Sequence, residues 1–311
     1  MNFVTFEELS HCIYRNIEKI PEDVDLIVGI PRSGTLAGVL LSLYLNLPYV
    51  DIDILIQGGR VRSGNTRRCS DWVTDVKDAK HILIVDDSIS SGKAIRQVKK
   101  ELKERNIHKN CTFLAVYALR VNVALVDIYF EICEQPRMFE WNYMHHWALE
   151  YTCMDIDGVI CDDPGVSERL SEKKYREFLE NAKAKIIPTK RVGKLVSGRR
   201  EKYRKETEAW LKKNGVAYEE LFMIPNENNA GDHAAFKADI YKNSDSILFI
   251  ESSYEQAVRI CEITKKPVFC VENGQFITDK NVERNLRNIC NNWKITAKRV
   301  IKKILRKIDY V

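Results

Sequence analysis

Two pairs of acidic residues follow apolar runs of the sequence, and each pair could bind or transfer a phosphate-bearing molecule. The first pair is Asp86 with Asp87, and the second, about seventy residues later, is Asp155 with Asp157. Adjacent carboxylates can accept hydrogen bonds from the vicinal hydroxyls of a ribose. In a pair spaced i, i+2, one carboxylate can attack phosphorus while the other protonates the leaving oxygen. The presence of both pairs in one chain predicts a two-step reaction.

The first pair opens a segment suited to a phosphorylated ribose. Backbone N–H groups of a short turn that leads into a helix bind anions. Ser90 and Ser91 add hydroxyl donors to this turn, and Gly92 lets the backbone come close to a ligand. The alternative, an ordinary helix cap, needs only one such residue. Two carboxylates at the end of a buried strand are costly without a ligand, so a ribose-phosphate site is favoured.

Alternating strand and helix patterns surround the first pair. We expect strands at 25–30, 48–56, 81–85 and 111–119, helices at 35–46 and 92–105, and an arginine-rich loop at 57–71. Such alternation predicts a parallel sheet with helices on both faces. Ligands of such sheets bind beyond the carboxyl ends of the strands, and the loops 31–34 and 86–92 both leave such ends.

The alternation restarts at Tyr151. We expect strands at 151–154, 194–196, 246–250 and 267–271, and a helix at 172–185. The fold class is therefore α/β with two domains, each a mainly parallel sheet flanked by helices. The expected boundaries are 1–149 and 150–290, followed by a basic amphipathic C-terminal helix at 291–311. The aromatic-rich join at 137–147 favours packed domains over a flexible linker.

Composition excludes several classes of protein. The 311 residues contain 45% hydrophobic and 30% charged residues, and no apolar run approaches a membrane span. We expect no signal peptide in the N-terminal residues, and the nine cysteines form no Cys-x-x-Cys pair, which favours reduced thiols in the cytoplasm. The net charge of +5 is concentrated near the C-terminus. Residues 293–308 either lie on an anionic membrane or dock on the protein, and nucleic acid is not expected as a partner.

Residues 20–135 resemble the type I phosphoribosyltransferases, in which segment 82–92 corresponds to the motif that binds phosphoribosyl pyrophosphate (PRPP). In that family a loop like 29–34 holds the pyrophosphate, and a mobile lid like 57–71 closes over it. Arg60, Arg62, Arg67 and Arg68 are the candidate lid residues. The PRPP-binding residues that the resemblance implies are Arg32, Ser33, Gly34, Asp86, Asp87, Ser88, Ile89, Ser90, Ser91, Gly92 and Lys93. A hood that reads a nucleobase is not recognisable after Tyr117.

The chemistry that this resemblance implies is displacement of pyrophosphate at the anomeric carbon of ribose. Mg²⁺ would bridge the pyrophosphate and the ribose hydroxyls. Attack from the opposite face would give a β-linked 5-phosphoribosyl product. A sugar hydroxyl acting as the acceptor would need a general base, for which Asp53 and Glu140 are candidates on sequence alone.

Residues 150–272 resemble the haloacid dehalogenase superfamily of phosphatases, because Asp155-Ile156-Asp157-Gly158 is followed in order by a strand-end serine, a helical lysine and a strand-end acid. The resemblance implies Asp155 as the nucleophile and Asp157 as the general acid and base. It also implies that Ser197 and Lys237 bind the transferring phosphoryl group. The implied Mg²⁺ ligands are Asp155, Asp157 and Glu251, although Ser252 stands where a further acid often follows. About forty residues separate Asp157 from Ser197, so we expect a minimal cap and an open site.

Together the two resemblances suggest the bifunctional enzymes that install ribofuranose in bacterial polysaccharides such as capsule or O-antigen. The implied function is transfer of 5-phosphoribose from PRPP to a glycan acceptor, favoured as lipid-linked, followed by removal of the 5-phosphate. The implied location is the cytoplasm, with the inner face of the cytoplasmic membrane as an option. Two alternatives stay open: a nucleobase phosphoribosyltransferase coupled to a nucleotide phosphatase, and a non-catalytic PRPP sensor that controls a phosphatase. The oligomeric state, including a homo-oligomer, is open as well.

Overall fold

The chain divides into two compact units, residues 2–141 and residues 142 onward together with Met1. The structure, a computed structural model, describes residues 1–62, 64, 69, 72–107, 110–226, 232–282 and 285. The sequence suggested a boundary after Leu149, eight residues later. Aromatic contacts explain the difference, because Trp141 stacks on Phe139 in the first unit whereas Tyr143 packs against Phe269 in the second.

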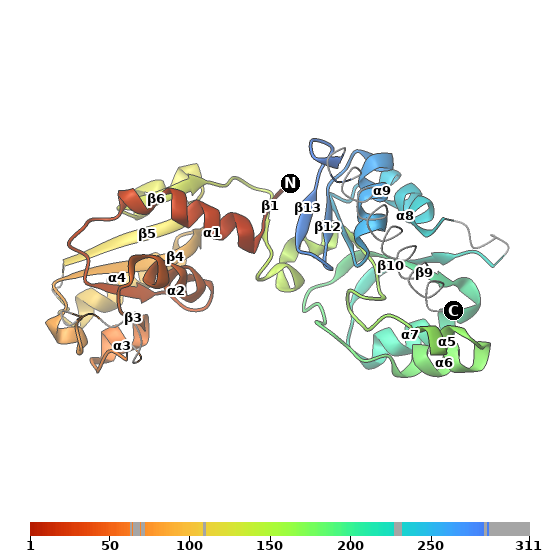
Figure 1. Ribbon diagram of the computed structural model, residues 1–311, viewed down its shortest axis with the longest axis horizontal. Helices are drawn as coiled ribbons and strands as arrows, with labels where there is room; N and C mark the ends of the chain where they lie inside the picture. Colours follow the sequence, from red (N-terminus) through yellow and green to blue (C-terminus); the bar gives the residue numbers. More distant parts are fainter. Residues whose placement is uncertain are drawn as a thin grey trace, which may run out of the picture. The chain divides into compact units, whose positions relative to one another are not determined.

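The N-terminal unit is built on a parallel sheet with the strand order β3-β2-β4-β5-β6 (Figure 1). Its strands are β2 (Leu26–Gly29), β3 (Tyr49–Asp51), β4 (His81–Ile89), β5 (Asn110–Ala118) and β6 (Ile128–Ile132). Its helices are α1 (Phe6–Arg15), α2 (Ser33–Leu45), α3 (Ile52–Gln57) and α4 (Lys93–Glu104). A smaller parallel sheet pairs β1 (Asn2–Val4) with β7 (Arg137–Phe139).

Alternate residues of β4 face opposite layers of helices. Leu83 and Val85 pack in the core beneath α1 and α2, whereas Ile82 and Ile84 pack in the core beneath α3 and α4. Strands buried on both faces carry continuous apolar runs, which is why this strand was recognisable from the sequence. The expected parallel sheet flanked by helices is confirmed.

Two expected elements of the N-terminal unit differ in the structure. The predicted strand 48–56 is a strand only over Tyr49–Asp51, because the Asp51 side chain accepts a hydrogen bond from Ile54 N at 3.0 Å and begins α3. The strand expected to end at Val85 continues to Ile89, so the acidic pair lies within β4.

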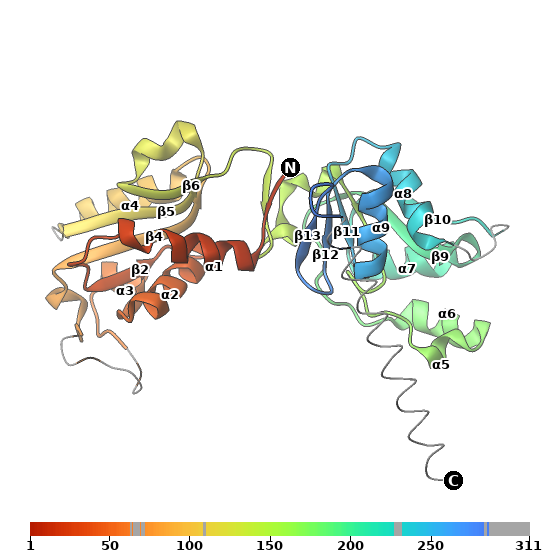
Figure 2. The same ribbon diagram turned by 45° about the horizontal axis from the view of Figure 1, so that its top comes forward.

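The C-terminal unit has the strand order β10-β9-β8-β11-β12-β13, parallel except for β13, which runs antiparallel to β12 (Figure 2). Its strands are β8 (Thr152–Met154), β9 (Val192–Arg200), β10 (Tyr218–Ile224), β11 (Leu248–Glu251), β12 (Val268–Cys270) and β13 (Gln275–Ile277). Its helices are α5 (Val166–Arg169), α6 (Glu172–Asn181), α7 (Arg204–Lys213), α8 (His233–Lys242) and α9 (Tyr254–Thr264). Short 3₁₀ helices across the chain are Ile17–Lys19, Val76–Asp78, Arg120–Leu125, Tyr143–His145, Trp147–Tyr151 and Glu201–Tyr203.

The helices of the C-terminal unit form two groups. Helices α8 and α9 pack on the sheet around Phe249 and Val196. Helix α6 packs with α7, where Trp210 Nε1 donates to Ala182 O at 2.8 Å. The predicted helix 172–185 is shorter in the structure and ends at Asn181. The chain beyond it is extended, and Ala184 forms an isolated β-bridge with Cys161.

No helix in the described part of the chain is long and apolar enough to cross a membrane. The predicted C-terminal helix, 291–311, and its membrane-binding stretch, 293–308, lie outside the described residues.

Candidate functional sites

The acidic pair of the N-terminal unit lies where β4 meets the start of α2. Asp86 and Asp87 are 8% and 5% exposed. A Cβ atom on Gly34 would lie 2.7 Å from Val85 O and 3.1 Å from Asp86 Oδ1. Only glycine therefore allows the first turn of α2 to approach the pair this closely. The structure brings the two predicted PRPP elements, 31–34 and 86–92, together.

Burial and the neighbouring carboxyl group change the ionisation of both acidic side chains. Burial, followed by the charge of Asp87, raises the pKa of Asp86 to about 8. Burial also raises the pKa of Asp87, but the hydrogen bond that Trp141 Nε1 donates to its Oδ2 at 2.8 Å opposes this rise. Arg137, which is itself buried, opposes it further. Near neutral pH Asp86 therefore holds its proton.

Side chains from outside the turn after β4 form hydrogen bonds with its backbone. Gly92 precedes α4 with φ of +71°, and a Cβ atom there would lie 2.1 Å from Leu125 Cδ1. The side chains of Asn122 and Arg96 donate hydrogen bonds to the carbonyl oxygens of Ser90 and Ser91, respectively. Phosphate binding by the backbone N–H groups and serine hydroxyls of this turn stays a prediction.

The other predicted PRPP residues differ in exposure. Ser90, Ser91, Lys93 and Arg32 are exposed, and Ser33 and Ser88 are half-buried. Ile89 is 2% exposed in the core, so only its backbone can contribute.

Two groups of predicted residues remain without a demonstrated role. Of the lid arginines, Arg60 and Arg62 are exposed, and Arg67 and Arg68 lie outside the described residues. Asp53 is exposed in the first turn of α3. Glu140 accepts a hydrogen bond from Phe6 N at 2.7 Å, and burial raises its pKa. The use of Asp53 or Glu140 as a general base stays a prediction.

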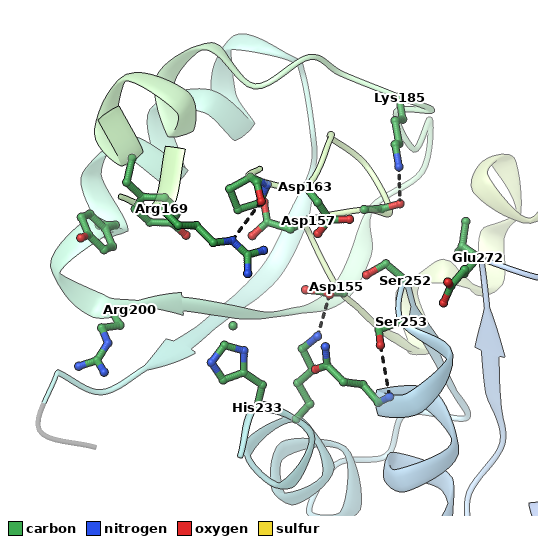
Figure 3. A pocket seen from close by; sticks show the side chains of 18 of the residues that line it. Asp155, Asp157, Asp163, Arg169, Lys185, Arg200, His233, Ser252, Ser253 and Glu272 are labelled. Carbon is green, nitrogen blue, oxygen red and sulfur yellow. Dashed lines mark hydrogen bonds and ion pairs between the residues drawn. The ribbon is translucent and has the colours of Figure 1, made fainter. Parts of the chain in front are cut away.

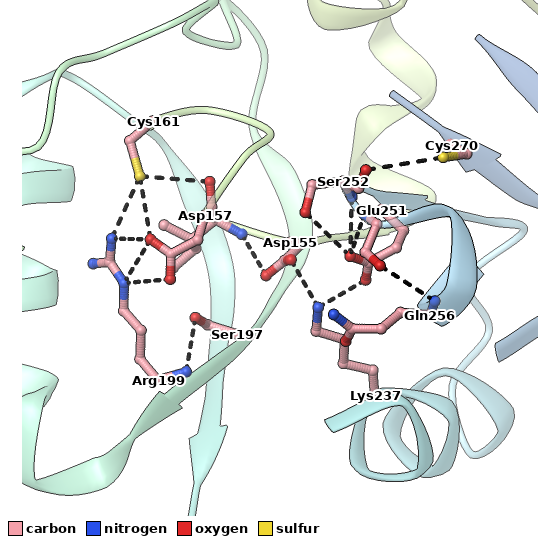
Figure 4. A network of polar contacts seen from close by, with 12 residues as sticks. Asp155, Asp157, Cys161, Ser197, Arg199, Lys237, Glu251, Ser252, Gln256 and Cys270 are labelled. Carbon is pink, nitrogen blue, oxygen red and sulfur yellow. Dashed lines mark hydrogen bonds and ion pairs between the residues drawn. The ribbon is translucent and has the colours of Figure 1, made fainter. Parts of the chain in front are cut away.

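The second site gathers the predicted phosphatase residues at the carboxyl ends of β8, β9 and β11 (Figure 4). Lys237 Nζ lies 2.7 Å from Asp155 Oδ2 and 2.7 Å from Glu251 Oε2. All three side chains are buried. Burial raises the pKa of Asp155 although the charge of Lys237 opposes it. Burial lowers the pKa of Lys237, but the two carboxylates outweigh this effect and hold it above its usual value.

Glu251 is fully engaged with the protein. Besides Lys237, it accepts hydrogen bonds at Oε1 from Ser252 N at 2.9 Å, Ser253 N at 3.1 Å and Ser252 Oγ at 3.3 Å. Within the described ranges, no three His, Cys, Asp or Glu side chains are placed to hold a common metal ion. This arrangement does not offer Glu251 to a cation, and Mg²⁺ ligation by Asp155, Asp157 and Glu251 stays a prediction.

Asp157 is held by Arg199, a residue to which the sequence gave no role. Arg199 is 1% exposed, and its Nη2 lies 2.7 Å from Asp157 Oδ1 while its Nε lies 3.1 Å from Oδ2. Its Nη1 also donates to Thr207 Oγ1 at 3.3 Å. The buried hydroxyl of Ser197 accepts a hydrogen bond from Arg199 N at 3.2 Å. Arg199 thus organises the side of the site opposite Lys237.

A cavity of about 1150 Å³ lies over Asp155 (Figure 3). The short insert between Asp157 and Ser197 supplies part of its wall through Arg169 and Tyr175. Pockets of about 300–1,000 Å³ hold whole drug-sized ligands, so this cavity exceeds the needs of a phosphate group alone.

Comparisons with known proteins identify the domain that contains the first of these sites. Residues 5–142 match the family model described as "Phosphoribosyl transferase domain". Residues 5–142 are a type I phosphoribosyltransferase domain. The match ends at residue 142, so the interpretation of the C-terminal unit rests on its geometry and motifs.

Two amidophosphoribosyltransferases are similar to part of this chain. That of Staphylococcus aureus is 29% identical over 101 residues, covering 30% of this chain and 20% of the relative. That of Synechococcus elongatus is 33% identical over 99 residues, covering 29% of this chain and 20% of the relative. The chain therefore spans about a fifth of the length of these curated relatives.

Solved structures with similarity include two purine-type enzymes. A purine phosphoribosyltransferase from Pyrococcus horikoshii has 21% identity and a TM-score of 0.32, covering 45% of this chain and 92% of that chain. The xanthine-guanine-hypoxanthine phosphoribosyltransferase of Helicobacter pylori has 18% identity and a TM-score of 0.34, covering 45% and 90%.

Proposed function

We propose that this protein transfers 5-phosphoribose from PRPP to a hydroxyl group of a glycan and then removes the 5-phosphate. The observation that carries the proposal is the presence of two separate sites on one chain. One is the buried Asp86–Asp87 pair within a phosphoribosyltransferase domain. The other is the buried Asp155–Lys237–Glu251 cluster beneath a large cavity.

In the first step the N-terminal unit binds PRPP through three of its elements. The turn 88–92 holds the 5-phosphate, Asp86 and Asp87 accept hydrogen bonds from the ribose hydroxyls, and the loop 31–34 holds the pyrophosphate. The contact between Gly34 and Asp86 supports one continuous site for the donor. Mg²⁺ bound together with PRPP would supply charge neutralisation of the departing pyrophosphate.

In the second step the C-terminal unit acts as a phosphatase of the haloacid dehalogenase type. Asp155 attacks phosphorus and forms a phosphoaspartyl intermediate, which water hydrolyses. Lys237 and Ser197 bind the phosphoryl oxygens, and Asp157 exchanges a proton with the leaving oxygen and with water. The contacts of Glu251 support a role in holding Lys237 toward Asp155.

A glycan acceptor, favoured as lipid-linked, is supported by the cavity volume of the second site, since a bulky phosphorylated product has to reach Asp155. The nucleobase alternative fits the phosphoribosyltransferase domain as well as glycan transfer does. The two functions differ in what triggers release of pyrophosphate from PRPP.

Incubation with PRPP, Mg²⁺ and either membrane-linked glycan or a panel of nucleobases separates these functions. The proposal predicts pyrophosphate release that depends on the glycan, together with a pentose added to the glycan. Release that depends on a purine or pyrimidine would favour the alternative. PRPP binding without pyrophosphate release under any acceptor would favour a sensor.

A further inference from the structure

The cavity of the C-terminal unit contains two arginines and a histidine that the proposed phosphatase chemistry does not use. Arg169 at the end of α5, Arg200 at the end of β9 and His233 at the start of α8 all line it (Figure 3). They come from three separate elements of the sequence. Their convergence on one cavity is therefore a property of the fold.

The two arginines are not neutralised by close carboxylates. Among the described residues, neither Arg169 nor Arg200 has an ion pair within 4.0 Å. Arg169 Nε donates instead to Pro164 O at 3.0 Å, and Arg200 Nη1 donates to Asn226 O at 3.1 Å. Asp163 lies in the same cavity and interacts with Arg169 at longer range. Each guanidinium thus retains donors for a ligand.

His233 connects the arginines to the reacting centre. A Cβ atom on Gly198 would lie 2.8 Å from His233 Nδ1, so the imidazole packs directly against the residue after Ser197. Burial lowers the pKa of His233, and the nearby charges of Lys237, Arg169 and Arg200 lower it further. The cations therefore lie close enough to act on the same imidazole.

The phosphoryl group itself does not require these residues, because Lys237 and Ser197 already serve it in the proposed mechanism. We propose that Arg169, Arg200 and His233 form a second anion subsite that selects phosphomonoesters carrying a further negative group. This inference rests on the proposed phosphatase function. It deepens that function by assigning an acidic substrate, in which the second group is a carboxylate or a phosphate ester.

The test compares kcat/KM for three substrates of the full-length protein. Methyl β-ribofuranoside 5-phosphate carries one anionic group, the corresponding 5-phosphoribosyl glycoside of glucuronic acid adds a carboxylate, and ribose 1,5-bisphosphate adds a phosphate. We expect kcat/KM to be about tenfold or more higher for at least one substrate that carries a second anionic group, in line with a hydrogen bond to a charged group. Whichever is preferred identifies the second group.

The variants Arg169→Gln and Arg200→Gln should each reduce this preference several-fold. Their kcat/KM should fall more for the preferred substrate with two anionic groups than for the methyl glycoside. Lys213→Gln, which removes an exposed cation of α7 outside the cavity lining, should leave the preference intact. Equal kcat/KM for all three substrates, or variants that lower all three equally, would overturn the subsite and leave the phosphatase standing. Failure to hydrolyse any phosphomonoester would overturn both.

Discussion

Replacing Asp86 by asparagine should abolish a release of protons that accompanies PRPP binding to the unmodified protein. Burial and the neighbouring Asp87 raise the pKa of Asp86 to about 8, so at pH 7 about 90% of the molecules hold this proton. Ribose hydroxyls that donate to the pair stabilise its ionised form and lower this pKa. A fall to about 6 would release about 0.8 proton per PRPP bound at pH 7.

Calorimetry in two buffers with different ionisation enthalpies measures this number directly. The Asp155→Asn background keeps the 5-phosphate intact during the titration. We expect release of about 0.8 proton at pH 7 and about 0.2 at pH 5.5, where both states hold the proton. Asp86→Asn should remove the release at both values. Identical binding enthalpies in the two buffers, or a release that persists in Asp86→Asn, would refute the raised pKa of Asp86.

The same group gives the stability of the protein a pH dependence of known sign. The pKa of Asp86 rises from an ordinary 3.8 in the unfolded chain to about 8 on folding, so the folded state binds more protons between these values. The free energy of unfolding therefore falls as the pH rises from about 4 to 8, by at most about 6 kcal/mol at about 1.4 kcal/mol per pKa unit. Asp86→Asn should flatten this part of the profile in urea titrations.

Two other substitutions test the local geometry of the sites. Gly92→Ala should lower the free energy of unfolding by about 1–3 kcal/mol more than Gly215→Ala. Both glycines have positive φ, but only at Gly92 would the new Cβ atom clash with Leu125. Equal shifts of the urea midpoint in the two variants would contradict this. Arg199→Met should lower the free energy of unfolding by about 3–5 kcal/mol, because it leaves Asp157 without its ion-pair partner. Arg199→Lys should lower it less, because lysine keeps the positive charge. An Arg199→Met variant as stable as the original protein would count against the ion pair.

Structure was most predictable from the sequence where one segment contains both the buried apolar residues and the candidate site residues. β4 was recognisable because an apolar run buried on both faces leads directly into two carboxylates, a combination that a structural strand does not need. The start of α3 was missed for a local reason. The run 52–56 is as apolar as a strand, and only the capping contact of Asp51 turns it into a helix.

Contacts between distant segments could not be predicted. Trp141 binds Asp87 across 54 residues, and Arg199 binds Asp157 across 42. Nothing near Trp141 or Arg199 in the sequence specifies these partners. The aromatic character of 137–147 and the arginine pair at 199–200 were visible, but one arginine faces inward and the other lines the cavity. That distinction depends on the alternation of side chains along β9 in the folded sheet.

Mass spectrometry of the glycan product tests the central claim, sequential attachment and dephosphorylation by one chain, most directly. With PRPP and a competent acceptor, the unmodified protein should add the mass of a pentose. Asp155→Asn should instead accumulate the mass of a phosphopentose, because its first site is intact and its nucleophile is gone. A variant that yields no product at all, or that yields the plain pentose, would contradict the account.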